Sequence, residues 1–556
     1  MKIIFTFLIA SLALVGCNKD SAPQEQDKKP AAVGADLISK DSLTNHIKIL
    51  ASDEFGGRAP ATPGEILTIN YLQDEFTKAG AVAGNNGSFF QKVPLASVEA
   101  INNPSLIISG KEGAVVDLKY RDDQVVWTRQ QVDGASIDAS ELVFVGYGIN
   151  APERDWNDYQ GVDVKGKTVV MLVNDPGYAT QDINIFNGNA MTYYGRWDYK
   201  LDEAGRQGAA AAIIIHDTKP ASYGWSTVSA SWTGPQFDMV RADASAGLVS
   251  IEGWVTKDVA TSLFEKAKLN IDKMYEMAKT KGFKAVEMNL TASVSVENKL
   301  NFIESNNVVA MIEGSESPEE VMIYMAHWDH LGTDDSIEGD GIYNGALDNA
   351  TGTSGLIELV KAFASEKPKR TVAFIAVTAE EQGLLGSAYY AAHPVFPLEK
   401  TVAGINMDGL NTFGPTKDVT IIGFGMSEIE NYIEKHAKSQ GRHLVADGEA
   451  EKGYFYRSDH FELSKLGVPM SYPKPGYEHI VKGTEYGFLK RQEYTKSHYH
   501  GPSDEYSEDW DLSGAVQDLQ LYYMVGKDIS NGNDWPKWNE GTEFKAARDT
   551  QMANKK

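Results

Sequence analysis

Four continuous apolar runs in the C-terminal half of the chain constrain its fold more than any other feature. They cover residues 321–326, 371–377, 401–407 and 419–422. Runs of this length are typical of strands buried on both faces, and the nearby segments 353–364 and 426–437 have the apolar periodicity of helices. Strands that alternate with helices form parallel sheets covered by those helices. The sequence therefore predicts an α/β fold with a mostly parallel central sheet flanked by helices.

Three of the four runs end at or just before side chains that can bind a metal ion. These are His327 after the first run, Glu380 and Glu381 after the second, and Asp408 after the third. In an open α/β sheet, ligands bind in the crevice beyond the carboxyl ends of the strands. We therefore expect these side chains to converge on one site.

Two further candidates lie in loops. Asp348 follows a glycine-containing turn, and His500 belongs to a second imidazole-rich stretch. Two imidazoles and three carboxylates can hold two zinc ions with one shared carboxylate. Asp348 is the preferred bridge, because each of its oxygens can take one metal, whereas the alternative role is to cap the following helix. The set predicts a two-metal hydrolase.

The adjacent acids Glu380 and Glu381 would repel each other without a cation between them. If one binds metal, the other is free to act as a base. We assign Glu381 to the metal, and Glu380 to taking a proton from water and passing it to the leaving amine. Asp329 can accept the second imidazole N–H of His327 and so fix the orientation of that ring.

Two neighbouring histidines compete with the assigned ligands. His330 is an alternative to His327, and His498 is an alternative to His500. Spacing does not choose within the second pair, because alternate residues of an extended segment face the same side.

The segment 126–297 has a different residue pattern, in which short β-like runs are separated by turn residues. Its phrases ELVFVGYGI, DYQGVDVKGKTVVMLV and GAAAAIIIHD resemble the protease-associated domain, a small β-rich insert of exopeptidases and subtilases. The alternative is that these runs are extra strands of the main sheet. We expect the peptidase domain to comprise 36–125 and 298–540, with 541–556 as a polar tail.

The N-terminus predicts export and lipid anchoring. A basic start and an apolar run from Ile3 to Val15 are typical of a signal peptide over residues 1–16. Cys17, the only cysteine, lies where bacterial lipoproteins are lipidated, although a lone cysteine there could also arise by chance. Residues 17–35 have the polar composition of a flexible tether. Asn18, in place of Asp, favours the outer membrane, facing the periplasm or the cell surface.

The net charge of -25 argues against nucleic acid and anionic lipid surfaces as partners. No feature of the sequence predicts a protein partner.

Five motifs, in this order, resemble the signature of the co-catalytic di-zinc aminopeptidase family, which includes leucyl aminopeptidases and glutamate carboxypeptidase. They are AHWDHLG, GALDNATG, TAEEQGLLGS, INMDG and YHGPSDE. The resemblance implies one zinc held by His327, Asp348 and Asp408, and a second held by Asp348, Glu381 and His500. It also implies Glu380 as the base, Asp329 as a supporting acid, and His500 rather than His498 as the ligand.

The resemblance extends weakly to residues around the pocket. Tyr499 and Asp504 would line or support the site. The segment RSDHFELSKLGVP, which contains Ser458, Asp459 and His460, would run near the pocket, with a structural role as the alternative.

The expected function is an exported aminopeptidase that acts on peptide substrates. The alternatives are a carboxypeptidase, a glutaminyl cyclase-like enzyme and an inactive, receptor-like binding module. A carboxypeptidase should present Arg or Lys to the substrate carboxylate. Arg457, Lys474 and Lys490 lie near segments that could form the pocket, so the sequence leaves the polarity of cleavage open.

Overall fold

The computed structural model describes residues 33–110, 113 and 115–553. The expected signal peptide, the lipidation site Cys17 and most of the expected tether lie outside these residues. In the part of the chain that is described, no helix is long and apolar enough to cross a membrane.

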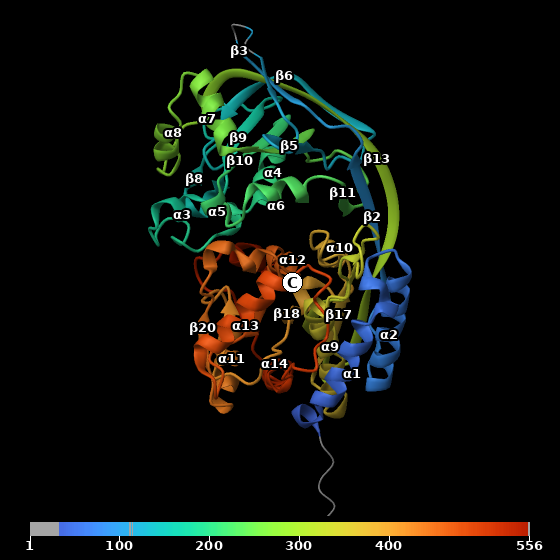
Figure 1. Cartoon of the computed structure of the whole chain (residues 1–556). Helices are drawn as coiled ribbons and strands as arrows, with labels where there is room; N and C mark the ends of the chain where they lie inside the picture. The colour runs from blue at the N-terminus through green and yellow to red at the C-terminus, as the bar shows by residue number, and fades with distance from the viewer. Residues whose placement is uncertain (1–32, 111–112, 114, 554–556) are drawn as a thin grey trace, which may run out of the picture. The chain divides into compact units, whose positions relative to one another are not determined.

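Four parallel strands form the centre of the main sheet. Their order is β17 (Arg370–Val377), β14 (Ser317–His327), β18 (Thr401–Asn406) and β21 (Met470–Pro475). Two of them, β17 and β18, are labelled in Figure 1. Every residue of β17 and β18 is buried, as expected for strands covered on both faces. The predicted α/β class, with a mostly parallel central sheet flanked by helices, is confirmed.

Antiparallel strands extend this sheet at both edges. On the β17 side lie β13 (Val286–Ile312) and β2 (Phe90–Ala100), and on the β21 side lie β19 (Asp418–Ile422) and β20 (His443–Ala446). The strands β19 and β20 are parallel to each other.

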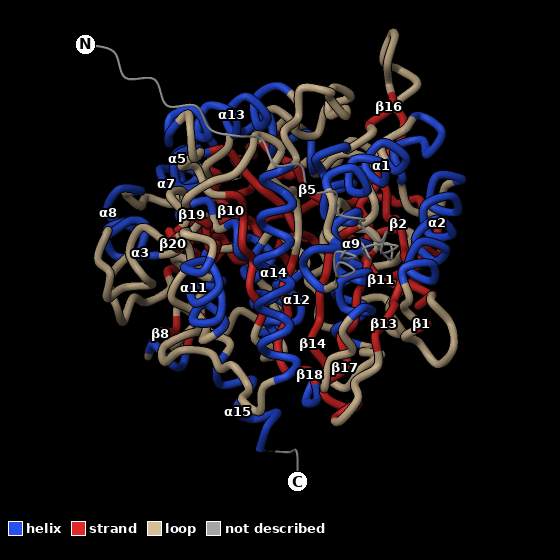
Figure 2. The backbone as a smooth tube through the Cα atoms, turned by 90° about the horizontal axis from the view of Figure 1, so that it is seen from below, coloured by secondary structure: helices blue, strands red, loops and turns tan. Residues whose placement is uncertain are grey.

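Helices enclose the main sheet. Figure 2 shows α14 (Ser513–Asn531) crossing the strands, with α11 (Ile429–Ser439) and α9 (Thr351–Ser365) on either side. Nearly every residue of α9 is buried, since α1 (Lys40–Leu50) and α2 (Pro63–Ala79) pack against it from outside. Two shorter helices, α10 (Leu385–Ala392) and α12 (His460–Lys465), contribute to the core on the opposite face.

A second set of strands has apolar clusters of its own. Four strands pair in parallel in the order β6 (Gly134–Phe144), β9 (Thr168–Leu172), β10 (Ala211–His216) and β12 (Ile251–Thr256). The strand β5 (Gln124–Trp127) pairs antiparallel with β12. The helix α4 (Trp197–Arg206) lies between β9 and β10 in sequence, and α7 (Lys257–Lys266) and α8 (Ile271–Ala278) follow β12. The segment is therefore mixed α/β rather than purely β-rich.

The long strand β13 belongs to both sheets (Figure 1). Its first half pairs with β6 and with β3 (Leu106–Gly110), which in turn pairs with β4 (Val115–Leu118). Its second half pairs with β2 and β17. The strands of the second sheet thus begin ahead of residue 126, the boundary that the sequence suggested.

The C-terminal segment, expected to be a polar tail, contains α15 (Lys545–Ala553). Arg548 of this helix is buried and donates hydrogen bonds to the carbonyls of Leu398 at 3.0 Å and Thr401 at 2.7 Å. Phe544, just before the helix, is also buried. This segment is therefore packed against the part of the chain that forms the main sheet.

Candidate metal centre

The structure brings all five predicted ligands together at the carboxyl ends of the central strands. His327 ends β14, Glu381 follows β17 and Asp408 follows β18. Asp348 lies in the turn before α9, and His500 lies after α13 (Gly483–Ser497). Five separate segments thus supply one site, and three of them are strand ends, as expected for a parallel sheet.

Asp348 lies between two imidazoles. Its Oδ1 is 3.3 Å from Nε2 of His327, and its Oδ2 is 3.4 Å from Nε2 of His500. Although burial raises the pKa of the Asp348 carboxyl, the hydrogen bonds from both histidines hold it well below its ordinary value. Each oxygen of this carboxylate therefore faces a different imidazole.

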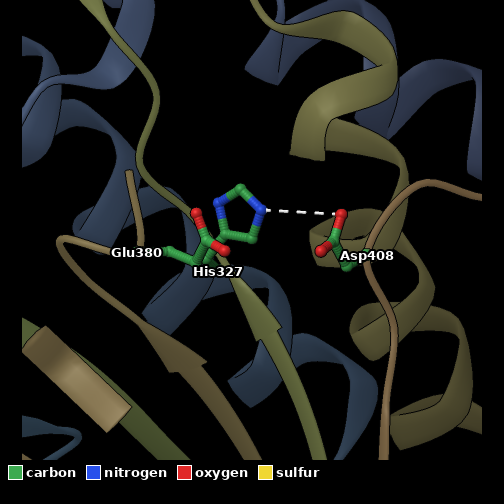
Figure 3. Close-up of side chains that lie close together, drawn as sticks. All are labelled: His327, Glu380 and Asp408. Atoms are coloured by element: carbon green, nitrogen blue, oxygen red, sulfur yellow. Dashed lines mark ion pairs between the residues drawn. The ribbon is translucent and has the colours of Figure 1, made fainter. Parts of the chain in front are cut away.

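The carboxylates of Asp408 and Glu381 also lie near different imidazoles. Oδ1 of Asp408 lies 3.9 Å from Nε2 of His327, whereas Oε2 of Glu381 lies 3.0 Å from Nε2 of His500. Figure 3 shows His327 with Glu380 on one side and Asp408 on the other. Within each of two groups, all ligand atoms lie within 4.8 Å of one another. One group is His327, Glu380 and Asp408, and the other is His327, Asp348 and Glu381. The base candidate Glu380 is thus beside the ligands.

The competing histidines have other contacts. Nδ1 of His330 is 2.6 Å from Oε1 of Glu381, so this buried ring supports that carboxylate. Nδ1 of His498 is 2.8 Å from the carbonyl oxygen of Ser503. Of the second pair, His500 is the histidine that faces the carboxylates.

Asp329 contacts the backbone of the two glutamates more closely than it contacts His327. Its oxygens accept the N–H groups of Glu380 at 3.1 Å and Glu381 at 3.4 Å. Nδ1 of His327 lies 3.9 Å from the Asp329 carboxylate but 3.2 Å from the Asp329 main-chain oxygen. Burial raises the pKa of Asp329 to about 7. The Asp329 carboxylate is thus hydrogen-bonded to the turn that carries Glu380 and Glu381.

Three donors surround Asp408. Its Oδ2 accepts hydrogen bonds from Ser458 Oγ at 2.7 Å and from the Tyr472 hydroxyl at 2.9 Å, and Lys474 Nζ lies 3.5 Å from Oδ1. Burial raises the pKa of Asp408, but Lys474 and His327 hold it well below its ordinary value. Ser458 is therefore a direct contact of a candidate ligand.

The remaining predicted pocket residues differ in burial: Asp459 and His460 are buried, whereas Tyr499 is half exposed. Asp459 accepts a hydrogen bond from Ser387 Oγ at 2.7 Å, and burial lowers the pKa of His460 to about 3. Both side chains are fully buried. Tyr499 stacks on the His500 ring with centroids 3.9 Å apart, and half of its surface stays exposed.

Asp504 holds the loop that carries Asp348. It accepts hydrogen bonds from the N–H groups of Leu347 at 3.0 Å and Asp348 at 3.1 Å, and from the Tyr494 hydroxyl at 2.9 Å. The Asp504 carboxylate therefore fixes the backbone of Asp348, the candidate for the shared ligand.

Arg58 is a site residue that the sequence did not reveal. Its buried guanidinium donates to the carbonyl of Trp328 at 2.9 Å, beside His327, and to those of Asn344 at 2.6 Å and Gly345 at 2.9 Å, in the loop before Asp348. A fourth hydrogen bond, of 2.7 Å, reaches Leu50. The sequence shows only an arginine after two glycines, and three of its four carbonyl partners lie 270 or more residues further along the chain.

Comparisons with known proteins show what this chain is similar to. Residues 307–524 match the model of peptidase family M28. An aminopeptidase from Aneurinibacillus sp. strain AM-1 is 18% identical, with a TM-score of 0.51 over 90% of this chain and 96% of that chain, which shows a shared fold.

Two curated relatives match shorter segments. A probable zinc metalloprotease of Pyricularia oryzae is 39% identical over 98 residues, which are 17% of this chain and 19% of the relative. The mouse aminopeptidase NAALADL1 is 33% identical over 122 residues, which are 21% of this chain and 15% of the relative. The matches thus span about a fifth or less of these relatives. The segment 307–524, which carries every candidate ligand, is similar to peptidase family M28.

Proposed function

We propose that this chain is a zinc-dependent aminopeptidase that removes N-terminal residues from peptides. The observation that carries the proposal is the position of Asp348, whose two oxygens face two different imidazoles. A carboxylate shared between two metal ions needs this arrangement.

The charge of the site supports the presence of bound cations. Four carboxylates lie together, those of Asp348, Glu380, Glu381 and Asp408. Among the described residues, Lys474 is the one Lys or Arg that forms an ion pair with any of them. Clustered buried carboxylates are unfavourable without compensating charge. Imidazole and carboxylate oxygens are donors that zinc accepts.

The distances favour a division of the ligands into two groups that share Asp348. His327, Asp348 and Asp408 would hold one ion, and Asp348, Glu381 and His500 the other. When bound, zinc supplies a water of lowered pKa and a Lewis acid for the substrate carbonyl.

Glu380 is the proposed base. Burial raises the pKa of its carboxyl well above the ordinary value, and the neighbouring Glu381 raises it further. A carboxyl with a raised pKa is suited both to take a proton and to give it back. Glu380 would take the proton from the attacking water and deliver it to the leaving amine, while Asp329 holds the Glu380 backbone in place.

The direction of cleavage is tested with one peptide prepared in three forms, namely unmodified, N-acetylated and C-amidated. Zinc-loaded protein should release the N-terminal residue from the first and third forms and leave the acetylated form intact, and a chelator should abolish this activity. Mass spectrometry identifies the product ends. Release of C-terminal residues from the acetylated form would show a carboxypeptidase instead. No hydrolysis by zinc-loaded protein would favour a binding module.

We further propose that the chain is an exported lipoprotein anchored through Cys17, and that residues 126–297 belong to a protease-associated domain. The signal-like N-terminus and the position of the single cysteine support the anchor. Metabolic labelling with a fatty acid should mark the wild-type protein and not Cys17→Ser. Equal labelling of both proteins would refute the anchor.

A further inference from the structure

The loop 378–386, which carries Glu380 and Glu381, has an unfavourable backbone conformation. Two of its residues that are not glycine, Ala379 and Leu384, have positive φ angles of 52° and 62°. Residues with a side chain adopt this left-handed region at a cost in free energy, and such strain persists only where the surrounding structure holds the backbone. The contacts around this loop therefore decide where the Glu380 carboxyl lies.

Asn307 of β13 closes the base of this loop. Its Oδ1 accepts the N–H of Thr378 at 3.0 Å, and its Nδ2 donates to the carbonyl of Gly386 at 2.8 Å. The same two residues are joined by a main-chain hydrogen bond of 3.0 Å, from the Gly386 N–H to the Thr378 carbonyl. The Asn307 side chain is fully buried and also donates to Gln91 Oε1 at 3.0 Å. Both ends of the loop are thus fixed to β13.

Thr378 anchors the loop through its side chain as well. Its hydroxyl lies 2.6 Å from that of Ser305, and Ser305 donates to Oε2 of Glu65 at 2.9 Å. Because Ser305 has one hydroxyl proton and gives it to the carboxylate, Thr378 is the donor of the first bond. All three side chains are buried. A series of two hydrogen bonds thus runs from Glu65 to the residue two positions before Glu380.

Glu65, in the first turn of α2, is buried without a cation. Only 1% of its surface is exposed, and it forms no ion pair with any residue that the structure describes. Its oxygens accept two further hydrogen bonds, from the Ala61 N–H at 2.5 Å and from Asn306 Nδ2 at 3.0 Å. A buried carboxylate is costly unless hydrogen bonds compensate it. A glutamate that only capped α2 would need the bond to Ala61 alone, so its contacts with β13 require another explanation.

Asn306 extends these contacts to a second part of the site. Its carbonyl accepts the Nε1–H of Trp328 at 3.0 Å, and Trp328 lies between His327 and Asp329 in sequence. The Trp328 side chain is fully buried. Through β13, Glu65 is therefore connected both to the segment that carries a candidate ligand and to the loop that carries the candidate base.

We propose that Glu65 and Asn307 are positioning residues for Glu380, and that they act through a buried brace completed by Ser305 and Thr378. The inference rests on the proposed function, because it gives the brace the task of placing the proposed base. None of the four residues is a proposed metal ligand. Displacement of a reacting group by about 1 Å costs about 10²-fold in rate, so loss of the brace should lower kcat.

Two variants of Thr378 separate hydrogen bonding from packing. Thr378→Val removes the hydroxyl and keeps the volume, whereas Thr378→Ser keeps the hydroxyl and leaves a small cavity. With zinc-loaded protein and an unmodified peptide, Thr378→Val should lower kcat roughly tenfold with KM nearly unchanged. Thr378→Ser should retain most of kcat. A residue that only filled space would give the reverse order, because the cavity would then be the larger defect.

Thr371→Val is the matched control. Thr371 lies at the other end of β17, is buried, and donates from its hydroxyl to the carbonyl of Pro318 at 2.7 Å. This variant should lose about as much stability as Thr378→Val in thermal unfolding but keep the wild-type kcat. Elemental analysis should find the same zinc content in every variant, because the brace acts on the base and not on the ligands.

Variants of the two positioning residues test whether the brace acts as a unit. Glu65→Gln replaces an accepting oxygen by an amide donor, and Asn307→Asp loses the donor to the Gly386 carbonyl, so each should lower kcat. Glu65→Gln combined with Thr378→Val should lose little more kcat than Thr378→Val alone, because both changes break one series of hydrogen bonds. Ser305→Ala breaks the same series and replaces Thr378→Val if that variant does not fold.

The outcomes separate the brace from the proposed function. Wild-type kcat in Thr378→Val, or losses in Glu65→Gln and Thr378→Val that multiply in the double variant, would overturn the brace and leave the peptidase function intact. A fall in zinc content that accompanies the fall in kcat would also overturn it, since the defect would then lie in the metal centre. No hydrolysis by zinc-loaded wild-type protein would overturn the proposed function and the brace together.

Discussion

Asp348 is the residue on which the proposed metal centre depends, because both imidazoles approach it. Asp348→Ala should lower the bound zinc from about two ions to one or fewer per chain, since each ion loses a shared ligand. Elemental analysis after dialysis measures the content. Asp335→Ala, which removes an acid from an exposed turn position, is the matched control. Unchanged zinc content in Asp348→Ala would exclude a bridging role.

Glu380→Gln separates proton transfer from metal binding. The amide keeps the shape of the side chain but cannot accept the proton, so kcat should fall by about 10²- to 10⁴-fold. The zinc content should stay the same, because Glu380 is not among the proposed ligands. Steady-state kinetics and metal analysis check both points, with Glu434→Gln on the exposed face of α11 as the control. Near-normal turnover would refute the assignment of Glu380 as the base.

At the level of elements, Arg58 joins the loop after β14 to the loop before α9. Arg58→Met should lower the free energy of unfolding by about 3 kcal/mol or more, because buried carbonyls that lose their donor cost about 1–3 kcal/mol each. Denaturant unfolding measures this loss. A loss below about 1 kcal/mol would show that water or a shifted backbone replaces the guanidinium.

The central strands and helices could be predicted from the sequence because a buried element shows its burial in its own pattern of apolar residues. The apolar runs at 321–326 and 371–377 lie within β14 and β17, and the helix predicted at 353–364 lies within α9. A strand buried on both faces needs apolar residues throughout, whatever its neighbours are.

Other features depend on partners that are distant in sequence. The strand β3 belongs to the second sheet because it pairs with β13. The sequence of neither strand indicates which strand it pairs with. The carbonyl partners of Arg58 and the backbone contacts of Asp329 depend in the same way on how the loops meet. The division of the ligands between two ions was implied by a family resemblance and stays a prediction, although each oxygen of Asp348 faces a different imidazole.

For the whole molecule, bound metal should be a main source of stability. The chain has one cysteine and so forms no internal disulfide, and the metal centre links loops from five segments. A ligand present at a thousand times its Kd stabilises the folded state by about 4 kcal/mol. Zinc-loaded protein should therefore have a Tm several degrees above that of chelated protein in scanning calorimetry. Identical Tm values would contradict zinc binding to the folded chain.

The most direct test of the two-metal centre is anomalous X-ray diffraction from zinc-loaded crystals at the zinc absorption edge. The account predicts two peaks, one beside each oxygen of Asp348. His327 and Asp408 should complete the ligands of the first, and Glu381 and His500 those of the second. A single peak, or a peak bound by His330 or His498 in place of these ligands, would contradict it.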